Sequence, residues 1–325
     1  MKRTFLKQLG RSLLVAALAS SGVAMAQDYP NKPIRIVAPF APGGAVDILA
    51  RIIAEGLAPL YGQSVIVDNK PGASGHLGAQ LVAKSPGDGY TLLVGTIGIH
   101  AAYASYTHLT YSPAKELQPI MVIGESPNIV LVSAHSPYKT FADFLADAKV
   151  RPGRLNYGSA GPGSSVHMVT ALFELASGTQ LNHVPYKGSG PALVDLIGGQ
   201  IDVMFDNMSS GLPQVRGGKL RALAVTGAQR DKRLPEVPTI AEAGVPGYSG
   251  TSWFTLAAPA SMPAALVEKL NKDVQRVLAS PDVVARYDKL GINYTPNTPA
   301  EAAAFFKSET VKWNRVIEAA KLQLD

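Results

Sequence analysis

Three segments rich in glycine and hydroxyl residues could bind a small anion. They are residues 40–47 (FAPGGAVD), 69–76 (NKPGASGH) and 158–167 (GSAGPGSSVH). Glycine lets backbone amides approach a ligand closely, and a helix that follows such a loop offers its positive end to an anion. Each segment alone is better explained as a turn that caps a helix. Three of them after strands of two βα sets predict a cleft lined by amides and hydroxyls.

Two further stretches bring side-chain chemistry to strand ends. Residues 184–191 (VPYKGSGP) form another predicted strand-to-helix loop, with an aromatic ring and a cation available. Asp206 and Asn207 follow a run of valine, methionine and phenylalanine. Asp206 could bind a ligand ammonium or cap the chain from Ser209 onward, and the sequence leaves both interpretations open.

The sequence lacks the motifs of the common enzyme classes. It has no cysteine, no G-x-x-x-x-G-K-[ST], and no dinucleotide-type G-x-G-x-x-G after a predicted strand. No G-x-S-x-G follows a predicted strand, and the six histidines form no H-E-x-x-H pair. We therefore expect no catalytic residue, no metal and no cofactor.

Apolar strand patterns alternate with helical patterns along the chain. Strands are predicted at residues 34–39, 64–68, 90–95, 120–123, 129–133, 155–158, 183–186, 201–205, 220–226 and 253–257. Helices are predicted at residues 46–60, 76–84, 140–150, 164–176, 191–197, 263–279, 282–290 and 299–322. This order predicts an α/β fold with a mostly parallel sheet covered by helices on both faces.

A chain of 325 residues is expected to divide its core between two lobes. The last three helices have no strands of their own, so we expect them to pack back on the first lobe. The predicted division is residues 27–124 and 228–325 for lobe 1 and residues 125–227 for lobe 2, joined by a hinge of two or three strands.

Residues 1–26 have the layout of a secretory signal peptide. Lys2, Arg3, Lys7 and Arg11 flank a short apolar run that ends in Ala-Met-Ala. Cleavage would remove four basic residues and no acidic one, so most of the net charge of +6 belongs to the leader. We therefore expect an exported, periplasmic protein that binds no nucleic acid.

The ordered set of loop segments closely resembles the Bug family, the extracytoplasmic solute receptors of tripartite tricarboxylate transporters. The matching segments include IRIVAPFAPGGAVDILAR, VDNKPGASGHLGA, LNYGSAGPGSSVHM, VPYKGSGPALVDLIGGQIDVMFDN and LRALAVTGAQRDKRLPEVPTIAEAGVPGY. No single segment is diagnostic, but their order is specific and they extend over most of the chain.

The resemblance implies a periplasmic-binding-protein type II fold, in which two α/β lobes close over one ligand in an interlobe cleft. It implies a small carboxylate ligand, such as an amino acid, a di- or tricarboxylate or an aromatic carboxylate. Membrane transporter subunits would be the partner, and a sensory receptor for a two-component system is the alternative. We also expect a monomer.

The resemblance also nominates ligand-binding residues. Those from lobe 1 are Phe40, Ala41, Gly43, Gly44 and Asp47, with Ser74 and Thr96 on neighbouring loops. Those from lobe 2 are Ser159, Gly161, Ser164, Ser165 and His167, and Asp206 is the position expected to discriminate between substrates.

Overall fold

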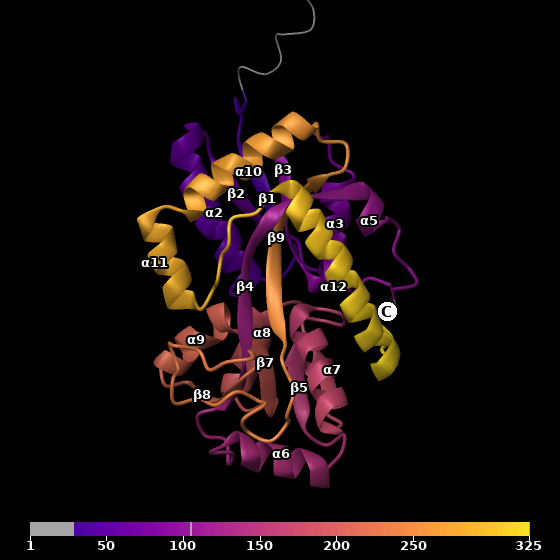
Figure 1. Ribbon diagram of the computed structural model, residues 1–325, viewed down its shortest axis with the longest axis vertical. Helices are drawn as coiled ribbons and strands as arrows, with labels where there is room; N and C mark the ends of the chain where they lie inside the picture. Colours follow the sequence, from indigo (N-terminus) through magenta and orange to yellow (C-terminus); the bar gives the residue numbers. More distant parts are fainter. Residues whose placement is uncertain (1–28, 105, 325) are drawn as a thin grey trace, which may run out of the picture.

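The two βα sets fold into two halves stacked along the long axis of the molecule (Figure 1). The computed structural model describes residues 29–104 and 106–324. The predicted signal peptide therefore lies outside the described residues. None of the helices in those two ranges is long and apolar enough to cross a bilayer.

The first half is built on three parallel strands, with β1 in the middle. Its elements are β1 (Ile34–Ala38), α2 (Ala45–Tyr61), β2 (Val65–Asn69), η2 (Ala73–Gly75), α3 (His76–Ala83), β3 (Thr91–Thr96), α4 (Ile97–His100) and α5 (Pro113–Glu116). β1 is almost wholly buried, as expected for a strand covered by helices on both faces. α2 buries an apolar stripe that includes Leu49, Ile53 and Leu57.

The second half repeats this plan around β5, which pairs in parallel with β6 and β7. Its elements are α6 (Phe141–Val150), β5 (Asn156–Ser159), α7 (Ser165–Ser177), β6 (Asn182–Pro185), α8 (Ser189–Ile197), β7 (Val203–Asn207), α9 (Met208–Arg216) and β8 (Leu220–Val225). Thr140 caps α6 as predicted, in a capping box with Asp143. α9 was not predicted, because Gly211 and Pro213 are poor helix formers.

Two long antiparallel strands join the halves, β4 (Leu117–Ser133) and β9 (Thr251–Pro259). β4 pairs with β9 over residues 117–127 and with β7 and β8 over residues 128–133. Two strands had been predicted within this stretch, but they form one strand of 17 residues with register shifts near Pro119 and Gly124. The sheet is therefore mixed, and the prediction of a mostly parallel sheet is wrong for its centre.

The C-terminal helices contact both halves rather than the first one only. They are α10 (Ala264–Leu278), α11 (Pro281–Leu290) and α12 (Pro299–Ala320). α10 packs on α2 and β4 as expected, but α11 contacts α9 and α12 contacts α7 (Figure 1). Trp313 and Ile317 of α12 share an apolar cluster with Phe173 of α7.

The loop between β8 and β9 packs with the second half. Ile240, Val245 and Tyr248 are buried in the same apolar cluster as Phe205 of β7. The amide of Gly250 donates a hydrogen bond of 2.9 Å to the carbonyl of Thr226. The apolar side chains of this loop thus complete the core of the second half, whereas the expected division at residues 227/228 assigns the loop to lobe 1.

Candidate functional site

A small cavity, which we call the inner cavity, lies where the loops of the two halves meet. Its volume is about 20 Å³, the space of roughly one water molecule. It is lined by Phe40, Gly44, Ala45, Val46 and Thr96 of the first half, and by Ala160, Ser164, Ser165, Ser189 and Asn207 of the second.

Helix N-termini from both halves converge on the inner cavity. Gly44 is the N-cap of α2, Ser164 that of α7 and Asn207 that of α9, and Ser189 is the first residue of α8. Thr96 caps the short α4. Helix N-termini carry partial positive charge and unpaired amides, and none of the described residues lining the cavity is charged. The arrangement suits an anion held by dipoles rather than by a cation.

Two buried polar atoms in the wall of the cavity have no partner within the described part of the chain. They are Oγ1 of Thr96 and Oδ1 of Asn207, whose residues are 1% and 4% exposed. Buried polar atoms are normally hydrogen-bonded. These two atoms are therefore available to bind a ligand or an ordered water.

The two halves touch directly beside the cavity. The amide of Ala41 donates a hydrogen bond of 2.9 Å to the carbonyl of Lys187. A methyl group added to Gly190 would lie 2.2 Å from the carbonyl oxygen of Pro42. The structure is therefore a closed arrangement, in which the backbones of the two halves are in contact.

Asp47 holds the first glycine loop in shape rather than lining the cavity. Its carboxylate accepts hydrogen bonds from the amide of Gly43 (3.1 Å), from Asn69 Nδ2 (3.1 Å) and twice from Arg51 (2.9 and 3.1 Å). Burial alone would raise the pKa of Asp47, but the hydrogen bonds from Arg51, Gly43 and Asn69 together lower it. The amide of Gly43 is thus committed to Asp47.

His167 and Ser159 shape the loop of the second half. His167 Nδ1 accepts a hydrogen bond of 2.8 Å from the amide of Gly163, and its ring stacks on His183 with centroids 4.2 Å apart. Burial, and then the neighbouring His183, lower the pKa of His167 to about 3. A neutral His167 is the state that can accept this hydrogen bond.

Ser159 Oγ and His183 Nε2 lie as close together as a catalytic nucleophile and its base, but Ser159 is not exposed to a substrate. Ser159 Oγ lies 2.6 Å from His183 Nε2 and also accepts from the amide of Gly161. A catalytic pair of this kind must be open to substrate, and Ser159 is fully buried. The pair therefore acts as a structural part of the loop.

Asp206 lies behind the inner cavity. Its side chain is fully buried and accepts a hydrogen bond of 2.6 Å from Ser210 Oγ. Burial raises the pKa of Asp206 to about 6, against smaller lowering effects of hydrogen bonds from Ser210 and Ser189. Because Ser189 lines the cavity, Asp206 can affect its electrostatics without lining it.

A larger chamber, which we call the outer chamber, adjoins the inner cavity and shares Phe40 and Ala160 with it. Its volume is about 490 Å³. Ser74 and Gly161 line it, one from each half, and a methyl group on Gly161 would lie 2.8 Å from Ser74 Oγ.

The structure thus divides the predicted residues into groups. The inner cavity is lined by Phe40, Gly44, Thr96, Ser164 and Ser165, and the outer chamber by Ser74 and Gly161. Ala41 joins the two halves, and Asp206 lies behind the inner cavity. The loops are held in shape by Gly43, Asp47, Ser159 and His167. Ser189 and Asn207 also line the inner cavity. The sequence marks the segments that contain them, but it does not predict these two residues as ligand contacts.

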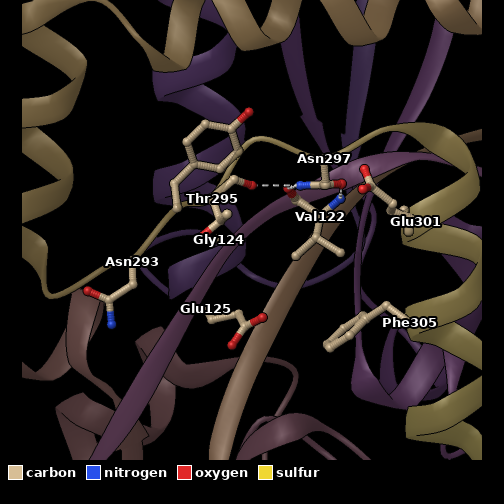
Figure 2. A pocket seen from close by; sticks show the side chains of 10 residues that line it. Val122, Gly124, Glu125, Asn293, Thr295, Asn297, Glu301 and Phe305 are labelled. Atoms are coloured by element: carbon tan, nitrogen blue, oxygen red, sulfur yellow. Dashed lines mark hydrogen bonds between the residues drawn. The ribbon is translucent and has the colours of Figure 1, made fainter.

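A separate hollow of about 250 Å³ lies on β4 beside the segment before α12 (Figure 2). Glu125 and Glu301 line it, which disfavours an anionic ligand. Asn297 bonds the amide and carbonyl of Val122 at 2.9 and 2.8 Å, and its Nδ2 also donates to the carbonyl of Thr295 at 2.9 Å (Figure 2). Glu301 is committed to the cap of α12 through Thr298. These polar groups stabilise the fold here.

Solved structures with closely similar folds are solute receptors. Rpa4515 of R. palustris, determined with adipate, has a TM-score of 0.87 and 40% identity, over 90% of this chain and 99% of that one. The periplasmic binding protein BugD has a TM-score of 0.86 and 32% identity, over 90% and 99%. MatC of Rhodopseudomonas palustris, with bound malate, has a TM-score of 0.84 and 34% identity, over 89% and 100%.

These similarities confirm the resemblance to Bug receptors and the two-lobe periplasmic-binding-protein fold. The profile of the family described as "Tripartite tricarboxylate transporter family receptor" matches residues 49–322. Its members are solute-binding receptors and not enzymes. The chain therefore belongs to the tripartite tricarboxylate transporter receptor family.

Proposed function

We propose that this receptor binds the carboxylate group of a small organic acid in the inner cavity and delivers the acid to membrane subunits of a tripartite transporter. The observation that carries the proposal is the convergence of helix N-termini from both halves on a cavity whose described lining has no charged side chain. The adipate of Rpa4515 and the malate of MatC support a carboxylate as the ligand.

The proposed contacts are amides and hydroxyls. On the first half they are the backbone at Gly44 and Ala45 and the hydroxyl of Thr96; on the second they are Ser164, Ser165, Ser189 and Asn207. Thr96 supplies a donor that has no partner within the described residues. Oδ1 of Asn207 has no partner within the described residues. A bridging water, or a hydroxyl or ammonium group of the ligand, can donate a hydrogen bond to it.

Ligand binding in this proposal requires motion of the halves. The inner cavity has space for about one water molecule, so the side chains and loops that line it must shift when a carboxylate binds between the closed halves. We place the hinge in β4 and β9, with residues 29–124 and 251–324 as the first lobe and residues 125–250 as the second. We also propose that the receptor is a monomer and works in the periplasm.

Thermal-shift screening of the purified receptor against a panel of organic acids tests the proposal. A ligand that binds only the folded state at 100 times its Kd adds about 2.7 kcal/mol of stability. At least one carboxylate should raise the melting temperature, and the corresponding amide or alcohol should not. If the neutral analogue stabilises the protein equally, the site does not bind carboxylates.

A further inference from the structure

The outer chamber is placed to receive whatever lies beyond a carboxylate held in the inner cavity. The two spaces share Phe40 and Ala160 as lining residues, so they are neighbours with a common wall. The outer chamber has about 490 Å³ and the inner cavity about 20 Å³. Because the outer chamber is the larger of these two neighbouring spaces, the remaining atoms of a longer acid can lie there.

The walls of the outer chamber present mainly apolar surface. Phe40, Leu109 and Leu324 line it with hydrocarbon alone, and two tyrosines add their rings. The hydroxyl of Tyr106 donates to the carbonyl of Pro162, and that of Tyr186 donates to Asp195 at 2.6 Å. Both hydroxyls are thus engaged with protein groups. Ser74, His108 and Lys187 add polar groups to the wall, and no carboxylate side chain of the described residues lines the chamber.

Leu324 reaches this chamber from the segment that follows α12. Lys321 adopts a left-handed conformation, and the amide of Leu322 bonds the carbonyl of Ile317 at 3.0 Å, which ends α12. Leu324 is then 1% exposed, and its Cδ1 would lie 3.0 Å from a methyl group placed on Gly163. Figure 1 shows this end of α12 beside α7. Leu324 therefore contacts the loop that leads to Ser164 of the inner cavity.

We propose that the outer chamber is the specificity compartment of the receptor and that Leu324 is a specificity-determining residue in its wall. The ligand class is then a carboxylic acid with an extended apolar body, either an aliphatic chain or an aromatic ring. A compact hydroxy acid such as malate leaves these apolar walls uncovered. This inference rests on the proposed binding of a carboxylate in the inner cavity.

Isothermal titration of the purified receptor with acetate, malate, adipate and phenylacetate tests the inference. We expect adipate or phenylacetate to bind at least about 100-fold more tightly than acetate or malate. The variant Leu324→Ala should weaken the better of these two acids about tenfold or more, and leave the affinity for acetate within about twofold.

Leu322→Ala is the matched control, because Leu322 lies on the same segment, packs against the same apolar cluster and does not line the chamber. Leu109→Ala, at another apolar residue of the same wall lining, should repeat the effect of Leu324→Ala if the latter variant does not fold. Tightest binding of malate, or equal effects of the chamber variants and Leu322→Ala, would overturn the inference. If none of the four acids, nor any other carboxylate, binds the wild-type protein, the proposed function itself fails.

Discussion

The amide of Ala41 donates a hydrogen bond of 2.9 Å to the carbonyl of Lys187, which links the first glycine loop of one half to the β6–α8 loop of the other. Glycines beside this bond permit the close approach of the two backbones. A methyl group on Gly188 would lie 2.9 Å from the amide nitrogen of Ala41, and one on Gly190 would lie 2.2 Å from the carbonyl oxygen of Pro42. The closed arrangement thus depends on two small residues at the seam.

Gly190→Ala should hold the halves apart. The added methyl group collides with backbone of the other half only in the closed arrangement, and alanine within α8 is a better helix former than glycine. We expect a fold at least as stable, a larger radius of gyration by small-angle scattering with ligand present, and an affinity reduced about tenfold or more. Gly198→Ala, at the exposed end of α8, is the control. An unchanged affinity would show that closure does not need this contact.

Gly44→Val should remove ligand binding while leaving the fold intact. Gly44 has a φ of −89°, which valine can adopt, and a Cβ there lies 3.4 Å from Ser189 Cβ in ordinary contact. The two further methyl groups of valine then meet the second half and the inner cavity. The thermal shift produced by the best acid should disappear in Gly44→Val and persist in Gly198→Val. Retention of the shift in Gly44→Val would exclude Gly44 from the site.

Asp47→Asn should loosen the first glycine loop. The change removes a charge that accepts hydrogen bonds from Arg51, Gly43 and Asn69, so we expect a loss of about 1–3 kcal/mol in the free energy of unfolding at pH 7. Asp88→Asn, which breaks one exposed ion pair with Lys32, should cost under about 1 kcal/mol.

The pKa of Asp47 is lower in the folded state than its usual value of 3.8. Its contribution to stability is therefore complete above about pH 4 and is lost as pH falls through the folded-state pKa. Denaturant unfolding between pH 7 and pH 3 should show a smaller acid-induced loss for Asp47→Asn than for the wild type. Parallel pH profiles for the two proteins would contradict this role.

Asp206 should make ligand binding depend on pH. Its folded-state pKa of about 6 lies above the unfolded value of 3.8, so ionisation opposes folding and stability falls as pH rises from about 4 to about 6. Ser210 donates a hydrogen bond to Asp206, and the nearby polar groups of Ser189 and Asn207 also lower its pKa. A bound carboxylate adds a negative charge near this group. The pKa of Asp206 then rises further, and binding takes up protons.

Affinity for the best acid, measured by titration calorimetry, should therefore decrease between pH 6 and pH 8. In Asp206→Asn the affinity should vary less over this range, because the variant lacks the carboxyl group at position 206 that takes up the proton. A wild-type affinity that does not vary with pH would show that Asp206 is insulated from the ligand.

The sequence predicted the features that depend on local patterns. Apolar strands followed by glycine loops and helices identified β1, β5 and the loops that bear Gly44 and Ser164, because strand period, turn residues and helix caps are all short-range signals. Because Gly211 and Pro213 are poor helix formers, the sequence pattern does not predict α9 or the N-cap position of Asn207. Gly124 and Pro127 interrupt the apolar strand pattern within β4, so the sequence predicts two strands where the structure has one.

Other features depend on contacts between distant parts of the chain. The packing of Ile240 and Tyr248 in the second half and the bond from Ala41 to Lys187 leave no mark on local periodicity. The burial of Leu324 in the outer chamber is of the same kind. Such contacts follow from how the two halves meet, which the sequence pattern of either half does not specify.

A crystal structure of the receptor with its tightest-binding acid tests the central claim most directly. We predict that one carboxylate group lies between Gly44 and Ser164, within hydrogen-bond distance of amides or hydroxyls from both halves. An acid seated in the hollow beside Glu125, or held by one half alone, would contradict the account.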